Sequence, residues 1–130
     1  MLRVPGEKLN IEPALSLQPD ITIYKLTGRL SLANGLEAAE KVIRQRIAEG
    51  VRKLVLDLTT LDYIDSSGIG TLISCNGQME QAGGVMRVAG AKGAVAQTFR
   101  LVHLDRIVPL DDSVEASCAS LRDNTGGRLR

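Results

Sequence analysis

The chain has 130 residues, which is the size of one ordinary domain and too short for two large hydrophobic cores. Hydrophobic residues make up 44% and charged residues 24%, a balance typical of folded globular proteins and unlike that of disordered chains. Sixteen basic and fifteen acidic side chains leave a net charge of +1, and aromatic residues make up only 2%. Because the chain has neither a strong positive field nor many aromatic rings, we expect no direct nucleic-acid binding.

The apolar segments are short, and none approaches the roughly 20 consecutive apolar residues of a membrane-spanning helix. The first ten residues contain no stretch like a secretory signal, so we expect a cytoplasmic protein without membrane insertion. The two cysteines, Cys75 and Cys118, lack metal-ligand spacing and are interpreted as buried free thiols. With His103 as the single histidine, the sequence predicts no metal site and no cofactor.

The first elements predicted in chain order are a β-hairpin and an amphipathic helix. Residues 13–28 contain Leu15 and Leu17 alternating with polar residues, then a turn and a β-rich run, which predicts a hairpin. Ser31 or Asn34 is expected to cap the helix that follows. The apolar residues of this helix recur at helical spacing, at Leu36, Ala39, Ile43 and Ile47.

Strands and helices alternate in the rest of the chain. The predicted strands are short apolar runs at 53–58, 85–89 and 107–108. The first of these is rich in leucine and valine and shows no clean alternation of apolar and polar residues, which favours a central strand covered on both sides. Helices are predicted from about Asp65, over residues 95–102, and after a cap at Asp111 or Asp112.

This order of elements predicts a single α/β domain. Its central sheet is expected to be mixed, mostly parallel with an N-terminal hairpin, and flanked by about four helices. We place the domain at residues 13–121, between an N-terminal extension at 1–12 and a polar C-terminal tail at 122–130. The sequence contains no repeat or linker that would divide this unit.

The segment that is most informative about function joins the inner strand to the second helix. It is predicted to form a short loop after Leu58, followed by a helix N-terminus at Asp65, Ser66 and Ser67. In parallel α/β sheets such junctions present functional groups, and the helix N-terminus adds N–H donors and partial positive charge. A serine there is addressable by a second protein, although Asp65 or Ser66 is equally interpreted as a simple helix cap.

Gly68 and Gly70 lie in the first turn of the same predicted helix. Glycine in a helix costs about 1 kcal/mol relative to alanine, so two of them demand a physical reason. One reason is the close approach of a partner's backbone, and the other is close packing inside the domain. The sequence alone leaves both open.

The run Leu-Val-Leu-Asp-Leu at 54–58, followed by Ile-Asp-Ser-Ser-Gly-Ile-Gly at 64–70, resembles the signature of the STAS family, the fold of bacterial anti-sigma-factor antagonists. The likeness extends over residues 21–121 and includes Leu-Thr-Gly-Arg-Leu at 26–30. The chain departs from the family pattern at Ser31, where members often have an acidic residue.

The resemblance implies an antagonist that binds an anti-sigma factor, often itself a serine kinase, and that is switched off by serine phosphorylation. By motif position the phosphoacceptor is Ser66, with Ser67 as the alternative, and Asp65 would orient the acceptor or contact the kinase. The ATP would belong to the kinase. Since loops on a rigid sheet commonly carry recognition, the partner-binding residues are expected to be Asp62, Tyr63, Asp65, Ser66, Ser67, Gly68, Gly70 and Thr71. Tyr63 is alternatively a core residue.

Other functions are considered beside this one. A serine hydrolase would use Ser66 or Ser67 with His103 as base, but the Gly-x-Ser-x-Gly elbow is missing and His103 is expected to be partly buried and structural. The patterns of phosphate-binding enzymes are also missing, so we expect no enzyme. Within the family, the alternatives are a non-switching scaffold of a stress-signalling complex and a cytoplasmic accessory subunit of a membrane transporter. The identities of the anti-sigma factor and sigma factor, the stimulus and the oligomeric state do not follow from the sequence.

Overall fold

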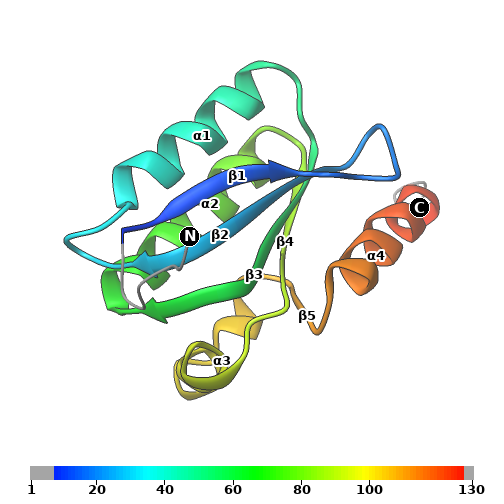
Figure 1. Ribbon diagram of the computed structural model, residues 1–130. Coiled ribbons are helices and arrows are strands. Elements are labelled where there is room, and N and C mark those ends of the chain that lie inside the picture. The colour runs from blue at the N-terminus through cyan, green and yellow to red at the C-terminus, as the bar shows by residue number, and fades with distance from the viewer. Residues whose placement is uncertain (1–7, 128–130) are drawn as a thin grey trace.

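The computed structural model describes residues 8–127, with side chains up to residue 122. Five strands form one sheet in the order β1-β2-β3-β4-β5, in which β1 pairs antiparallel with β2 and all other neighbours are parallel (Figure 1). The predicted mixed sheet with an N-terminal hairpin is therefore confirmed. The strands are β1 (Asn10–Ala14), β2 (Thr22–Leu30), β3 (Lys53–Ile64), β4 (Val85–Ala89) and β5 (Leu110–Asp111).

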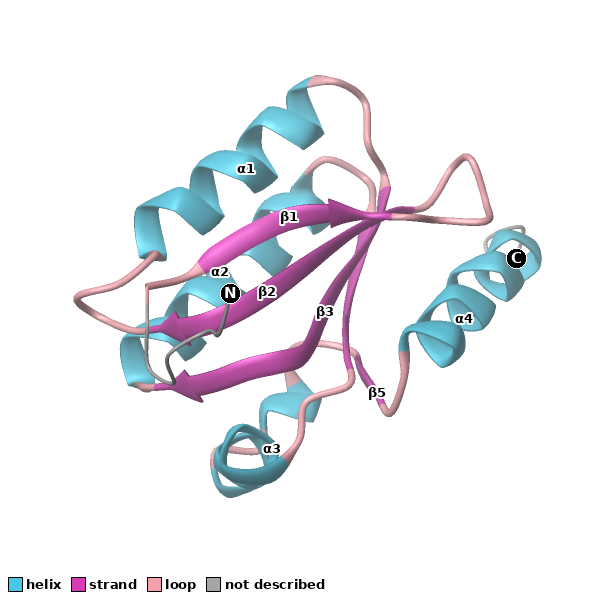
Figure 2. Ribbon diagram, in the orientation of Figure 1, coloured by secondary structure: helices cyan, strands magenta, loops and turns pink. Residues whose placement is uncertain are grey.

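Helices cover both faces of this sheet within the described residues (Figure 2). They are α1 (Leu36–Ala48), α2 (Ser66–Gln81), α3 (Gly93–Leu101), the short 3-10 helix η1 (Leu104–Arg106) and α4 (Val114–Gly127). Residues from α1, α2 and α3 share the main core cluster with the strands, whereas α4 packs into a second, smaller cluster. No helix in the described part of the chain is both long and apolar enough to cross a membrane.

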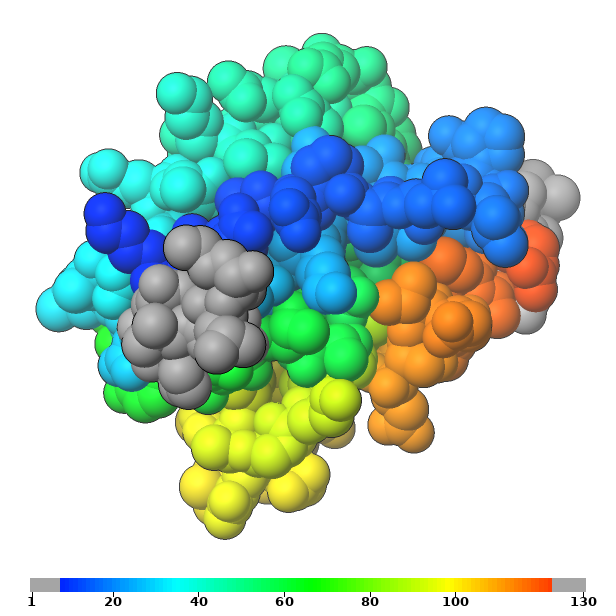
Figure 3. All heavy atoms as spheres, in the orientation of Figure 1, coloured from blue at the N-terminus to red at the C-terminus, as the bar shows by residue number. Residues whose placement is uncertain are grey.

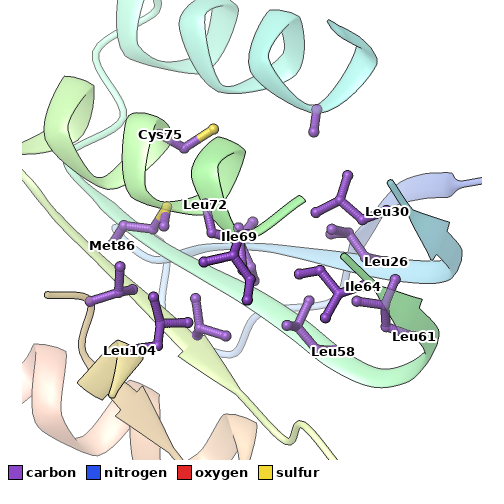
Figure 4. Packing of buried hydrophobic residues seen from close by; sticks show 14 of the residues in the cluster. Leu26, Leu30, Leu58, Leu61, Ile64, Ile69, Leu72, Cys75, Met86 and Leu104 are labelled. Atoms are coloured by element: carbon purple, nitrogen blue, oxygen red, sulfur yellow. The ribbon is translucent and has the colours of Figure 1, made fainter. Parts of the chain in front are cut away.

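β3 lies between these two clusters, as its apolar run predicts. Leu54 and Leu56 belong to the main core, while Val55 between them belongs to the cluster beneath α4. Cys75 lies in the main core and is free, and burial raises the pKa of its thiol to about 12. Cys118 is also free but only partly buried, which corrects the expectation of full burial. Figure 4 shows how closely the core leucines and isoleucines pack between α2 and the sheet.

The first strand of the hairpin lies earlier than predicted. β1 ends at Ala14, which pairs with Ile23, so Leu15 and Leu17 fall in the connecting loop and are 87% and 91% exposed. Their alternation imitates a strand, but β2 begins only at Thr22 and offers them no partner. β1 therefore begins within the predicted N-terminal extension at 1–12, and α4 continues into the predicted C-terminal tail at 122–130.

The segment predicted as a short loop after Leu58 is instead a continuation of β3 to Ile64. The register between β2 and β3 shifts twice, once between Lys25 and Thr27 and once between Gly28 and Arg29, and each shift places one extra residue on β3. As a result Leu58, Leu61 and Ile64 all face the core at a spacing of three residues. Bulges hide the two-residue period that would have marked this strand.

Helix caps also differ from the predictions. α1 begins after Gly35, whose φ of 87° only glycine adopts readily, and neither Ser31 nor Asn34 caps it. Those two residues exchange backbone hydrogen bonds of 3.0 and 2.8 Å with each other instead. α4 is capped by Ser113, whose Oγ accepts a 3.0 Å bond from the Ala116 N–H. The predicted cap at Asp111 or Asp112 is therefore wrong, because the following serine accepts this bond.

The last strand is formed by Leu110 and Asp111 rather than by residues 107–108. The Ile107 and Val108 N–H groups both donate to the Leu104 carbonyl, which closes the turn after η1 and removes them from strand pairing. Val108 is nevertheless completely buried, so its apolar character reflects the core and not a strand.

Candidate functional site

The junction between β3 and α2 is organised by Asp65. Its Oδ1 accepts a 2.9 Å bond from the Gly68 N–H and caps α2, while its Oδ2 accepts a 3.1 Å bond from the Leu32 N–H. These backbone N–H groups, that of Gly68 first, hold the pKa of the Asp65 carboxyl below its usual value. One carboxylate thus joins the start of α2 to the loop after β2, and the prediction of Asp65 as a cap is confirmed.

Gly68 is explained by packing inside the domain. It is buried, and a Cβ built on it would collide with the Leu30 carbonyl oxygen and the Ile64 side chain. Leu30 and Ile64 are the last paired residues of β2 and β3, so α2 starts directly against the ends of both strands. The predicted contact of Gly68 with a partner is therefore unsupported, because its neighbours within the domain leave no room.

Gly70 has the opposite environment. It is exposed, and a Cβ built on it would meet no atom within 4 Å among the described residues. Thr71 was expected on the same exposed face, but it is only 6% exposed, so this expectation is wrong. Thr71 lies four residues before Cys75 and eight before Met79, on the stripe of α2 that faces the core.

The two candidate serines differ in exposure. Ser66, the first residue of α2, is exposed, whereas Ser67 is partly buried. In the part of the chain that the structure describes, the Ser66 hydroxyl makes no hydrogen bond, because the neighbouring Asp65 already caps the helix. The site therefore presents a free hydroxyl at a helix N-terminus, where N–H donors and the helix dipole favour negative charge.

Leu32 is a component of this site that sequence reasoning missed. It lies in the loop between β2 and α1, is 75% exposed, and is held to Asp65 through its backbone N–H. The contact spans 33 residues of sequence, so no local pattern could reveal it. An apolar side chain is thereby presented to solvent near the start of α2.

Tyr63 and Asp62 lie at the second register shift of β3 and are both exposed. Tyr63 is 40% exposed, so its alternative assignment to the core is wrong. It pairs with Arg29 of β2, whose guanidinium carbon is 4.1 Å from the centroid of the tyrosine ring. This cation–π contact fixes an aromatic ring and a positive charge beside the junction.

His103 shares no pocket and no hydrogen bond with the two candidate serines in the described part of the chain. It is exposed rather than partly buried, adopts a φ of 55°, and lines a pocket of about 440 Å³ with Arg100 and Asp105. Neither Ser66 nor Ser67 lines this pocket, and the Asp65 carboxylate accepts from backbone N–H groups and not from the imidazole. The geometry thus gives no support to a Ser-His-Asp arrangement. In the described part of the chain, no group of three His, Cys, Asp or Glu side chains could hold a metal ion.

The sheet order and the serine at the start of α2 define an α/β domain of the STAS class. The family model for the STAS domain matches residues 12–117, so the chain belongs to this family. A relative from Bordetella bronchiseptica, BtrV, is 31% identical over 97 residues, which cover 75% of this chain and 83% of BtrV. BtrV is described as a candidate anti-sigma factor antagonist.

Solved structures share the same fold. An anti-sigma factor antagonist from Mycobacterium paratuberculosis superposes with a TM-score of 0.79 at 19% identity, covering 93% of this chain and 99% of that one. The phosphorylated form of the Bacillus cell fate determinant SpoIIAA gives a TM-score of 0.63 at 17% identity, with coverage of 85% and 98%. At these identities the similarity shows the fold alone.

Proposed function

We propose that this chain is an anti-sigma factor antagonist whose binding is ended by phosphorylation of Ser66. The observation that carries the proposal is the exposed, unbonded hydroxyl of Ser66 beside the capping Asp65. The description of BtrV and the phosphorylated form of SpoIIAA support it. In this scheme the unmodified chain binds the anti-sigma factor and frees a sigma factor, which is a cytoplasmic role.

The position of Ser66 suits a reversible change of charge. A phosphoserine carries about −1.5 to −2 charges, and a helix N-terminus stabilises such an anion through its N–H groups and dipole. Because the cap of α2 is supplied by Asp65 and not by Ser66, modification leaves the bond from the Gly68 N–H in place. We therefore expect phosphorylation to preserve the fold and to act on the surface.

The change in charge is large enough to end binding. If a partner carboxylate lies about 4 Å from the phosphate, their repulsion is of order 4 kcal/mol per unit charge pair at an effective dielectric constant of 20. That energy corresponds to roughly a thousandfold loss of affinity before screening by salt. The fixed Asp65 carboxylate next to Ser66 adds local negative charge.

The proposed partner-binding surface combines this serine with apolar and aromatic groups. Leu32 and Tyr63 supply exposed apolar area near the paired strand ends at Leu30 and Ile64. Asp62 precedes Tyr63, and Ser67 follows Ser66 in the first turn of α2. Gly70 leaves the next turn of α2 without a side chain, so a partner's backbone can approach there. We expect Leu32 and Tyr63 to contribute most of the binding energy, since buried apolar anchors dominate interfaces.

Calorimetric titration with a serine-kinase anti-sigma factor of the same organism tests the proposal. Ser66→Ala should bind with an affinity close to that of the wild type and block modification, whereas Ser66→Asp should weaken binding by at least tenfold. Ser67→Asp is the matched control and should have a smaller effect. Equal affinity of Ser66→Ala and Ser66→Asp would overturn the switch, and no binding by the wild type would favour a scaffold or a transporter accessory subunit.

A further inference from the structure

The loop between β1 and β2 exposes two leucines at the end of the domain opposite to Ser66. Leu15 and Leu17 are 87% and 91% exposed, the highest values among the large hydrophobic residues of the described chain. This loop precedes β2 and therefore lies at the amino end of the parallel strands, whereas Ser66 follows the carboxyl end of β3. Figure 1 shows the loop at the same end of the molecule as α4.

The loop and α4 enclose an apolar groove of about 420 Å³. Its apolar lining is made of Leu15, Leu17, Ile23, Val114, Cys118 and Ala119. Figure 3 shows the loop and α4 side by side on the surface. Leu15 and Leu17 thus project into solvent and at the same time form part of the wall of this groove. In a two-fold symmetric contact the same apolar surface would be covered on both copies.

The charges on this groove are also self-complementary. Glu115 and Arg122 both line it, are both exposed, and lie on α4 three residues before and four residues after Cys118. A two-fold axis that passes near Cys118 and is perpendicular to α4 would make the two helices antiparallel, so that each glutamate faces the arginine of the other copy. The net charge of +1 leaves little long-range repulsion between two copies.

We propose that this surface, the loop–α4 surface, binds a second copy of the chain as a two-fold symmetric dimer. Leu15 and Leu17 of one copy enter the groove of the other, and Glu115 pairs with the partner copy's arginine at the rim. The proposal is independent of the proposed function, because the Ser66 surface lies at the other end of the sheet and stays accessible in both copies. Such a dimer presents two partner-binding surfaces at once.

Sedimentation velocity and light scattering on the full chain test this proposal. The wild type should have twice the 13.9 kDa mass of the chain at about 100 μM, a concentration at which even a weak dimer is populated. The double variant Leu15→Ser with Leu17→Ser should weaken the dimer by at least tenfold. Leu101→Ser, which changes a leucine that is 73% exposed on α3, is the matched control and should leave the dimer intact.

A charge exchange tests the symmetry of the contact. Glu115→Arg alone should weaken the dimer, because it places two arginines opposite each other, and adding Arg122→Glu should restore it. Failure of the second change to rescue the first would overturn the two-fold arrangement. A wild type with the mass of one chain at about 100 μM would overturn the dimer itself. Loss of anti-sigma factor binding by the leucine variants of a monomeric chain would assign the groove to that partner instead.

Discussion

Two strand-to-helix junctions in this protein have similar sequences and different structures. At the β3–α2 junction Asp65 caps the helix, and the following Ser66 stays unbonded and exposed. At the β5–α4 junction Ser113 caps the helix, and Asp111 binds side chains. In both places an aspartate precedes a serine at the start of a helix. The residue that supplies the cap therefore decides which side chain remains available.

The two aspartates differ in the groups that hold them. Asp111 receives a bidentate bond from Arg87 of β4, at 2.6 and 3.2 Å, and a 2.6 Å bond from the buried Ser117 of α4. It ties α4 to the sheet through side chains. Among the described residues, Asp65 accepts its hydrogen bonds from backbone N–H groups, and the neighbouring serine hydroxyl stays in solvent. The first junction stabilises the fold, and the second also presents a group that another protein can modify.

The largest expected effect comes from filling the contact beneath α2. Gly68→Ala should lower the free energy of unfolding by roughly 2 kcal/mol, because the added Cβ meets the Leu30 carbonyl oxygen, which cannot move aside like a flexible side chain. Gly70→Ala is the matched control and should raise stability by about 0.5–1 kcal/mol, since nothing occupies that space. Denaturant unfolding measures both. Equal changes would contradict the different roles of the two glycines.

Removing the charge of Asp111 should have the next largest effect. Asp111→Asn leaves the partly buried Arg87 without its carboxylate and should destabilise the protein by about 2 kcal/mol in denaturant unfolding. Asp112→Asn changes an exposed neighbour and serves as the control, with little expected change. A loss of the same size in both variants would show that the bonds of Asp111 to Arg87 of β4 and Ser117 of α4 do not stabilise the fold.

Alanine substitutions at each junction test which side chain caps the helix. Asp65→Ala and Ser113→Ala should each lower the free energy of unfolding by about 1 kcal/mol, because each removes a helix N-cap. Ser66→Ala should change it by less than about 0.5 kcal/mol, since its hydroxyl bonds to no described residue. A clear loss of stability in Ser66→Ala would assign that serine a structural role.

The smallest expected effect is a change in how the stability of the protein depends on pH below neutrality. Burial acts to raise the pKa of Asp111, but the bonds from Arg87 and Ser117 outweigh it and hold that pKa below its ordinary value. A lowered pKa in the folded state adds stability that is fully present above the ordinary pKa of an aspartate and is lost as the pH falls through the folded-state value. The melting temperature should therefore decrease less steeply between neutral pH and pH 3 for Asp111→Asn than for the wild type. Parallel curves would contradict the assigned bonds.

The sequence was sufficient to predict the order of the elements because long apolar runs and helical spacings are local signals. The strand at Lys53–Leu58, the helix after Asp65 and the presence of the hairpin followed from them. The end of β3 did not, because its two bulges convert a period of two into a period of three. The caps of α1 and α4 could not be predicted either, since several residues with capping side chains precede each helix and tertiary contacts determine which one stands at its start.

The candidate site was predicted in its centre and less well at its edges. Ser66 and Asp65 follow from a motif at a strand-to-helix junction, and the structure gives them the expected exposure and cap. Thr71 was predicted to be exposed but is buried, because the sequence does not show which side of α2 packs against the core. Leu32 was missed because a bond from a residue 33 positions away holds its loop. Contacts distant in sequence decide which exposed groups surround the serine.

The most direct measurement is peptide mass spectrometry after the wild type is incubated with ATP and a serine-kinase anti-sigma factor. We expect one phosphoryl group on the peptide that contains Ser66, located at Ser66 by fragmentation, and none in the Ser66→Ala variant. Modification of Ser67 in place of Ser66, or an unmodified peptide from a kinase that modifies another substrate in the same reaction, would contradict the account.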